Sequence, residues 1–341
     1  MKKRISILLA LLLVSLTLFT ACSSKEPAQA PAEQPTGGTS EPAETPAKSS
    51  TPANIILATG GTTGTYYSLG GTIAQLWNSH IDGMNVTAQS TGASIENCRL
   101  IGNNEAEIAL LQNDVLDYAY NGIESFDGDG IDSLRAIGTL YPEVIQIVGR
   151  QDITEISELK GKKVSVGAPG SGTEANARQI LGAAGITYDD LTVSYLSFSE
   201  SADAYKDNQI DAFFVTSGVP NASIQDISAQ NDISIIEVPA DIAASVMADY
   251  PFYIEFNIPA GTYNKVEKDV NTVAILATLA TSEEQPEDMI YELTKTLFEN
   301  LPELANSHAK GKEISAEAAV EGVSIPFHAG AEKYFKEKGI L

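Results

Sequence analysis

The sequence after residue 53 predicts an α/β fold with mostly parallel sheets, and three observations support this. Short runs rich in β-branched residues alternate with longer stretches of helical character, an order typical of parallel strands joined by helices. The stretch 54–341 is long enough for two lobes. Two Gly-rich loops, at 59–67 and 167–174, each follow a predicted strand and precede a predicted helix.

The predicted strands are short apolar or alternating runs such as NIILAT and MNVTAQ, and the predicted helices are the longer mixed stretches between them. In the first half we expect strands at 54–59, 84–89, 108–111, 134–139 and 144–149, and helices at 67–80, 94–103 and 115–121. In the second half we expect strands at 163–166, 192–198, 212–215 and 233–238, and helices at 174–184, 201–208, 222–229 and 241–250. Three further helices, at 287–300, 302–310 and 329–338, complete the predicted order.

Residues 1–21 have the order of a secretory signal peptide. Met1–Arg4 is basic, 5–20 carries no charge, and the uncharged run is short for a membrane span. The residues Leu-Phe-Thr-Ala-Cys at 18–22 resemble the lipobox of bacterial lipoproteins, with Phe19 where Leu is usual. The resemblance implies cleavage after Ala21 and lipidation of Cys22, which would anchor the chain in a membrane. An uncleaved anchor helix is the alternative.

Residues 22–53 are expected to form a disordered tether. The segment holds six prolines among Ala, Glu, Ser, Thr and Gly, and it has no large apolar residue with which to build a core. A flexible arm of this length reaches about 30 Å on average. It would let an anchored domain meet a partner in the same membrane.

The charge and the cysteine count exclude several classes of protein. Removal of 1–21 changes the formal net charge from −24 to −27, because that segment holds three basic and no acidic residues. A surface this acidic has no basic groove for phosphates, so we expect no nucleic-acid partner, although solubility alone also explains the charge. With Cys22 lipidated, Cys98 has no partner, so neither a disulfide framework nor a cysteine zinc site is expected.

The first Gly-rich loop holds the candidate binding residues Gly61, Thr62, Thr63, Gly64, Thr65 and Tyr66. Glycine lets backbone N–H groups face a ligand, and the N-terminus of the following helix carries free donors and a partial positive charge. Such a loop can hold a carboxylate or phosphate without Lys or Arg. A tight turn between strand and helix is the alternative.

The second Gly-rich loop, Gly167–Glu174, adds the candidates Ser171, Gly172 and Thr173. It fits a dinucleotide-binding fingerprint only loosely, because the next predicted strand lacks the acidic residue that binds the ribose. Neither loop ends in Gly-Lys-Ser/Thr, which excludes a P-loop. Two further candidates, Ser94 and Thr216, also stand between a strand and a helix, where a helix-capping role is as well supported.

Few features of the sequence indicate an enzyme. The three histidines lie apart from the loops, and no Gly-x-Ser-x-Gly elbow or metal-binding spacing of His or Cys occurs. The run 127–132 (DGDGID) lacks the spacing of an EF-hand and is better explained as an acidic turn. We therefore expect no catalytic residue, no metal and no cofactor.

Seven collinear blocks of the sequence resemble the TAXI family, the solute-binding subunits of one branch of TRAP transporters. The blocks are ATGGTTGTYYSLGG (58–71), LQNDVLDYAYNG (111–122), LYPEVIQIVGR (140–150), LKGKKVSVGAPGSGTEANARQIL (159–181), DAFFVTSGVPNA (211–222), IPAGTYNKVEKDV (258–270) and IPFHAGAEKYFKEKGI (325–340). The resemblance covers nearly all of 54–341 and is far more specific than a single Gly-rich loop.

This resemblance implies a two-lobe clamshell of the type II periplasmic-binding-protein-like fold. Lobe 1 would be 54–145 plus 252–341 and lobe 2 would be 146–251, joined by hinge strands near 144–149 and 252–257. A small carboxylate such as glutamate, a related dicarboxylate or 2-oxoglutarate would lie between the lobes. In such a site Tyr66 or Tyr67 is expected to cover the carbon chain.

The expected site and the resemblance together indicate what the protein would bind and which partner it would meet. Gln112 and Asp114 are expected to take an ammonium group of the solute, with a capping role for Asp114 as the alternative. The chain would be a monomer on the outer face of the cell membrane and would deliver its solute to TRAP-type permease subunits. A binding protein of an ABC importer, a sensory lipoprotein and an extracellular hydrolase are the competing hypotheses.

Overall fold

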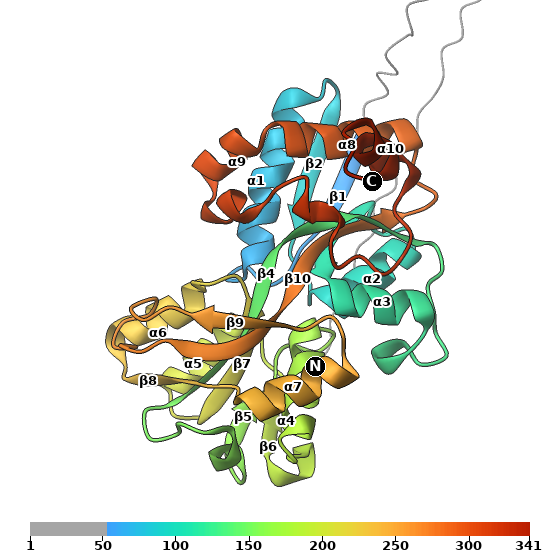
Figure 1. Cartoon of the computed structure of the whole chain (residues 1–341). Helices are drawn as coiled ribbons and strands as arrows, with labels where there is room; N and C mark the ends of the chain where they lie inside the picture. The colour runs from blue at the N-terminus through green and yellow to red at the C-terminus, as the bar shows by residue number, and fades with distance from the viewer. Residues whose placement is uncertain (1–52) are drawn as a thin grey trace, which may run out of the picture. The chain divides into compact units, whose positions relative to one another are not determined.

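The computed structural model describes residues 53–341 (Figure 1). The predicted signal peptide at 1–21, the lipidation site Cys22 and the tether at 22–53, apart from its last residue, lie outside the described residues. Within the described part, no helix is both long enough and apolar enough to cross a bilayer.

The first part of the chain is a series of βα units whose strands run parallel. Because β1 pairs in parallel with both β2 and β3, the loops that follow these strands meet at one edge of the sheet. The elements are β1 (Ala53–Ala58), α1 (Thr65–His80), β2 (Met84–Gln89), α2 (Ser94–Gly102), β3 (Ile108–Gln112) and α3 (Asn113–Asn121).

The chain then crosses the molecule in one long strand, β4 (Leu134–Arg150), where the sequence predicted two strands. Pro142 does not interrupt this strand. Proline has no N–H to donate, but β7 begins to pair with β4 only at Val144, so no hydrogen bond between β4 and β7 is lost at Pro142. The first part of β4 pairs antiparallel with β10 and its last part with β7 and β8.

A second series of βα units follows β4, and β5 pairs in parallel with both β6 and β7. The predicted strand 192–198 ends at Ser194, because Ser197 and Glu200 form a capping box that starts α5 at Phe198. The elements are β5 (Lys163–Ser165), α4 (Gly172–Ala183), β6 (Thr192–Ser194), α5 (Phe198–Lys206), β7 (Ala212–Ser217), α6 (Ala222–Gln230), β8 (Ile233–Ile236), α7 (Ala240–Asp249) and β9 (Ile254–Ile258).

The return path is β10 (Val270–Ser282), a 13-residue strand that the sequence analysis did not predict. It pairs antiparallel with β9, β4 and β3, and the strand order is β2-β1-β3-β10-β4-β7-β5-β6. The chain closes with α8 (Glu287–Glu299), α9 (Leu301–Ser307) and α10 (Ala329–Glu337). Short 3-10 turns occur at Glu124–Phe126, Ile156–Leu159, Tyr188–Asp190, Ala309–Glu313 and Ala318–Val320.

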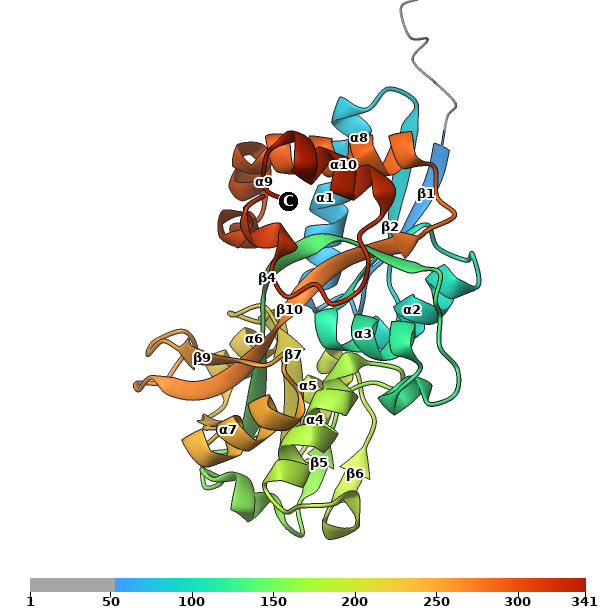
Figure 2. The same cartoon turned by 45° about the vertical axis from the view of Figure 1, so that its right-hand side comes forward.

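The α/β prediction is confirmed, and the parallel pairings lie within the two series of βα units. The antiparallel pairings involve β4 and β10, which Figures 1 and 2 show passing between the two series. The sequence predicted mostly parallel sheets and did not indicate that two long antiparallel strands pass from one series to the other.

The buried apolar side chains form two groups of cores, one around each series of βα units. The cores around α1–α3 and α8–α10 include Trp77 and Phe335, and we call this part lobe 1. The cores around α4–α7 also include side chains of 258–275, and we call this part lobe 2. The predicted limits, with 252–341 in lobe 1, differ from this grouping of the buried side chains and stay a prediction.

Candidate functional site

A cavity of about 60 Å³ lies where loops of both lobes leave the carboxyl ends of their strands. Ligands of open α/β sheets commonly bind at this position. Its lining consists of Gly60, Gly61, Gly64, Thr65, Tyr66, Thr91, Gly92, Ala93, Ser94, Gln112, Glu143, Ala168, Ser171, Gly172, Thr173, Ser197, Phe198, Thr216 and Ser217. Ten of the thirteen candidate binding residues from the sequence are therefore brought together here, although their role in binding stays a prediction.

Three candidates from the sequence do not line the cavity. Thr62 and Thr63 lie at the tip of a turn that the Gly64 N–H closes onto the Gly61 carbonyl at 2.8 Å, and Thr62 is exposed. Asp114 is buried on α3, where its carboxylate accepts hydrogen bonds from the N–H of Val115 and from Asn176. A Gly-rich pattern marks a loop but does not say which of its side chains turn inward.

The first turns of four helices contribute to the lining: α1, α2, α4 and α5. The backbone N–H groups of Tyr66, Gly172 and Thr173 have no acceptor among the described residues. In α2, by contrast, the N–H groups of Ile95 and Glu96 donate to the carbonyl of Gly170 in lobe 2, at 3.1 and 3.2 Å. Free donors therefore remain on α1 in lobe 1 and on α4 in lobe 2, and both favour an anion.

Glu143 on β4 is a buried carboxyl in the lining that sequence reasoning missed. The Tyr66 hydroxyl donates to its Oε2 at 2.5 Å, and the Tyr141 hydroxyl donates to its Oε1 at 3.3 Å. Burial raises the pKa of Glu143 to about 8, while these two hydroxyls and the charge of Lys310 act in the opposite direction. The LYPEV run around Glu143 gives no local sign of a buried carboxyl, because its bonded partner Tyr66 is distant in the sequence.

Lys310 lies behind this carboxyl, with little of its side chain exposed. Its Nζ binds Glu313 Oε1 at 2.7 Å and lies 5.7 Å from the centre of the Tyr141 ring. Gly218 of lobe 2 lets the lysine stem approach, because a Cβ there would lie 2.6 Å from Lys310 Cε. The lining itself holds no Lys, Arg or His.

Gln112 at the end of β3 offers an unused acceptor. Its side chain is buried, its Nε2 donates to Asn176 Oδ1 at 3.1 Å, and its Oε1 has no hydrogen-bond partner among the described residues. The amide lies against the first residue of α4, since a Cβ on Gly172 would lie 1.8 Å from Gln112 Oε1. A side chain at Gly172 would therefore have to displace the Gln112 amide.

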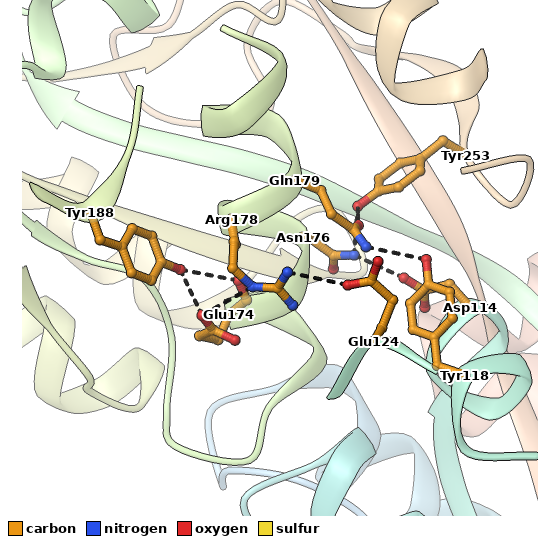
Figure 3. Close-up of polar contacts among 9 residues, drawn as sticks. All are labelled: Asp114, Tyr118, Glu124, Glu174, Asn176, Arg178, Gln179, Tyr188 and Tyr253. Carbon is orange, nitrogen blue, oxygen red and sulfur yellow. Dashed lines mark hydrogen bonds and ion pairs between the residues drawn. The ribbon is translucent and has the colours of Figure 1, made fainter. Parts of the chain in front are cut away.

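Hydrogen bonds next to the cavity join α3 of lobe 1 to α4 of lobe 2 (Figure 3). Asn176 Nδ2 donates to Asp114 Oδ2 at 3.0 Å, and Gln179 Nε2 donates to the Tyr118 hydroxyl at 3.2 Å. Tyr253 bonds both Asn176 and Gln179. Nearer the surface, Arg178 pairs with Glu124 at 3.2 Å, and Glu174 bonds Tyr188. The lobes are thus held together beside the cavity by side chains that are largely buried.

The remaining candidates for chemistry are few within the described residues. No group of three or more His, Cys, Asp or Glu side chains in 53–341 has the arrangement of a metal site. Further contacts between the lobes occur at the first loop, where Thr65 Oγ1 and Ser217 Oγ lie 3.0 Å apart. The arrangement is suited to holding a small polar molecule between two lobes.

Comparison with solved structures supports this description of the fold. A protein from Bordetella bronchiseptica RB50 is 16% identical, with a TM-score of 0.52, over 84% of this chain and 82% of that one. A structure described as a periplasmic transporter is 13% identical, with a TM-score of 0.50, over 84% of this chain and 93% of that one. These likenesses cover most of each chain and show that the α/β fold described above is shared with these structures. The model of the NMT1-like family matches residues 57–339, and the chain belongs to the NMT1-like family.

Proposed function

We propose that the protein is an extracytoplasmic solute-binding protein that holds a small carboxylate, such as glutamate, a related dicarboxylate or 2-oxoglutarate, in the cavity between its lobes. The observation that carries this proposal is the convergence of free helix N-terminal donors from both lobes on a cavity without Lys, Arg or His in its lining. Such donors bind anions through N–H groups and the helix dipole.

The size of the cavity supports a small solute. A single water needs roughly 10–15 Å³ by the same kind of measure, so about 60 Å³ is room for roughly four to six waters or for one solute of that total size. The apolar part of the lining includes Tyr66 and Phe198, which suit a short carbon chain between polar ends. Nucleotides and longer peptides exceed this space.

The bonds between α3 and α4 support a closing mechanism. A solute held by α1 of lobe 1 and α4 of lobe 2 makes both sets of contacts only when the lobes are together. Binding would therefore shift the population toward the closed form by the difference in affinity between the two forms. We propose that the site holds and releases its solute without covalent chemistry, and we assign it no catalytic residue.

The proposed partner is a TRAP-type permease of the TAXI branch. This assignment rests on the seven blocks that resemble the TAXI family, and membership of the NMT1-like family agrees with a role in solute binding. Cys22 would carry the lipid anchor on the outer face of the membrane, and the protein would act as a monomer. A gene for a large permease beside this one would favour the TRAP assignment, and an ATPase gene would favour an ABC importer.

A ligand screen tests the proposed function. The purified protein should gain thermal stability from L-glutamate, a related dicarboxylate or 2-oxoglutarate, because a ligand that binds only the folded state stabilises it by mass action. A screen of amino acids and organic acids at millimolar concentration with no shift in Tm would contradict a carboxylate solute. Replacement of Cys22 by Ser should release the protein from membranes, and retention of the Cys22→Ser variant would exclude the lipid anchor.

A further inference from the structure

Two buried acceptors line the cavity in addition to the helix N-terminal donors. Gln112 is 2% exposed and its Oε1 has no partner among the described residues. Glu143 is also 2% exposed, and its bonded partners are the hydroxyls of Tyr66 and Tyr141. A bare amide oxygen repels negative charge, and so does Glu143 once it has lost its proton, so neither acceptor is explained by an anionic group of the solute.

The orientation of the Gln112 amide is set by its neighbours. Asn176 uses its Nδ2 to donate to Asp114 and to Tyr253, at 3.0 and 2.8 Å, so its Oδ1 is the acceptor that remains. That oxygen accepts from Gln112 Nε2 and from the Thr216 hydroxyl. Rotating the Gln112 amide would place two oxygens together, so Oε1 stays as the free acceptor. A buried acceptor without a donor is costly and is rare outside functional sites.

The charges around Glu143 leave it without a cation of its own. Lys310, behind it, bonds Glu313, and the other groups that face it are Tyr66 of α1, Tyr141 of its own strand β4 and Asp114 of α3. Asp114 raises the pKa of Glu143 further, whereas Lys310 lowers it. A cation placed in the cavity would therefore stabilise the carboxylate form.

We propose that Glu143 and Gln112 bind the ammonium group of the solute, so that the site selects an amino acid over the 2-oxo acid or plain acid with the same carbon skeleton. This inference rests on the proposed function, in which the helix N-termini of α1 and α4 hold the carboxylate. An ammonium group has three N–H donors, which is enough for both acceptors. An oxo group has only acceptors, and it would leave Gln112 Oε1 and Glu143 unpaired.

A different role of Glu143, as a donor to the solute carboxylate, predicts a different proton release on binding and the opposite dependence of affinity on pH. If Glu143 stays protonated and donates to a solute carboxylate, binding releases no proton, and affinity falls as pH rises through its pKa of about 8. If Glu143 binds an ammonium group, it must lose its proton, so below that pKa each solute bound releases up to about one proton. Affinity for the amino acid then rises as pH approaches 8.

Paired solutes distinguish the two cases in the full-length protein purified in detergent. Calorimetric titration would compare L-glutamate with 2-oxoglutarate and glutarate, and L-aspartate with oxaloacetate and succinate. We expect the amino acid to bind at least about 100-fold more tightly than its partners, since a site built to accept N–H donors rejects analogues that lack them. Equal or tighter binding of an oxo or plain acid would overturn the inference and leave the proposed function standing. No binding by any acid would overturn both.

Glu143→Gln keeps the size of the side chain and removes its charge, and it should reduce the preference for the amino acid to below about tenfold. The matched control is Glu337→Gln on α10, whose carboxylate also accepts from a tyrosine hydroxyl, that of Tyr291 at 2.7 Å, but lies outside the cavity lining. It should keep the wild-type preference, and a preference that is equal in the two variants would contradict the role of Glu143. If Glu143→Gln fails to fold, the wild-type protein still tests the proposal. Titration in two buffers of different ionisation enthalpy measures the protons released on binding. Absence of proton release below pH 8 would contradict the proposal.

Discussion

Asn176 on α4 donates its Nδ2 to the carboxylate of Asp114 on α3 at 3.0 Å, and this bond joins the two lobes beside the cavity. Neither side chain is exposed, and neither lines the cavity. The Oδ1 of the same asparagine accepts from Gln112 and Thr216, which do line it. One residue thus connects the walls of the site to the contact that holds the lobes together.

Replacement of Asn176 by alanine should favour the open form. The change removes the bond to Asp114 and leaves several buried polar groups unpaired, each at a cost of about 1–3 kcal/mol. We expect solute affinity to fall by about 10- to 100-fold, because the closed form that binds becomes less populated. X-ray scattering with and without solute would show a larger radius of gyration for Asn176→Ala.

Glu124→Gln is the control for this prediction. Glu124 pairs with Arg178 across the same two lobes, but both side chains are partly exposed, and such pairs contribute only about 0–1 kcal/mol. Affinity in Glu124→Gln should therefore stay within a few-fold of wild type. An Asn176→Ala protein with wild-type affinity would show that this network does not influence closure.

Asp114 should make the protein less stable as pH rises. Burial raises the pKa of Asp114 to about 7, although the Val115 N–H and Asn176 lower it in part. Between about pH 4 and 7 the folded state holds a proton that the unfolded state has lost, so the free energy of unfolding decreases as pH rises through this range. The proton-dependent stabilisation is full at low pH and is lost above about 7.

The Asp114→Asn variant isolates this effect. It has no proton to lose, so its free energy of unfolding relative to wild type should increase from pH 5 to pH 8, by about 1 kcal/mol or more. Urea unfolding at several pH values measures the difference. A difference that is constant with pH would mean that Asp114 titrates at its ordinary value.

Most of the elements could be predicted because their patterns are local. Helix α4 begins at a Gly-Ser-Gly-Thr loop, and Met84–Gln89 was placed without error because turn residues bound it on both sides. Strand β10 was missed, since nearly every residue of Val270–Ser282 is buried on both faces and no alternation marks it as a strand.

The site could be predicted only as far as its loops. The Gly-rich segments with Ser171 and Thr173 mark helix N-termini, and the carboxyl ends of parallel strands bring such loops together. Glu143 could not be found this way, because its burial arises from Tyr66, which is 77 residues distant in the chain. The inward or outward direction of Thr62 depends on the conformation of a turn that the composition does not determine.

The hydroxyls of Ser171 and Thr173 are expected to contribute to binding. Ser171 Oγ caps α4 by accepting from the Glu174 N–H at 3.3 Å, and both residues line the cavity. The double change Ser171→Ala, Thr173→Ala should weaken binding of the solute by up to several kcal/mol and cost about 1 kcal/mol in stability through the lost cap. Calorimetry and urea unfolding measure the two effects separately, and wild-type affinity would remove this loop from the site.

Gly172 and Gly182 lie on the same helix and should respond in opposite ways to alanine. A Cβ on Gly172 would lie 1.8 Å from Gln112 Oε1 and 2.4 Å from its Cδ, so Gly172→Ala must push Gln112 out of its bond to Asn176 or push α4 away from lobe 1. A Cβ on Gly182 meets nothing within 4 Å. Alanine there should stabilise the helix by about 0.5–1 kcal/mol.

We therefore expect Gly172→Ala to lose at least about 100-fold in solute affinity, because the displaced Gln112 affects both the cavity and the contact between the lobes. Gly182→Ala should bind as wild type and unfold at a slightly higher urea concentration. Calorimetric titration of both variants, with circular dichroism to confirm that each is folded, makes the comparison. If Gly172→Ala bound the solute as tightly as Gly182→Ala, the contact between Gln112 and α4 would not be part of the solute-bound form.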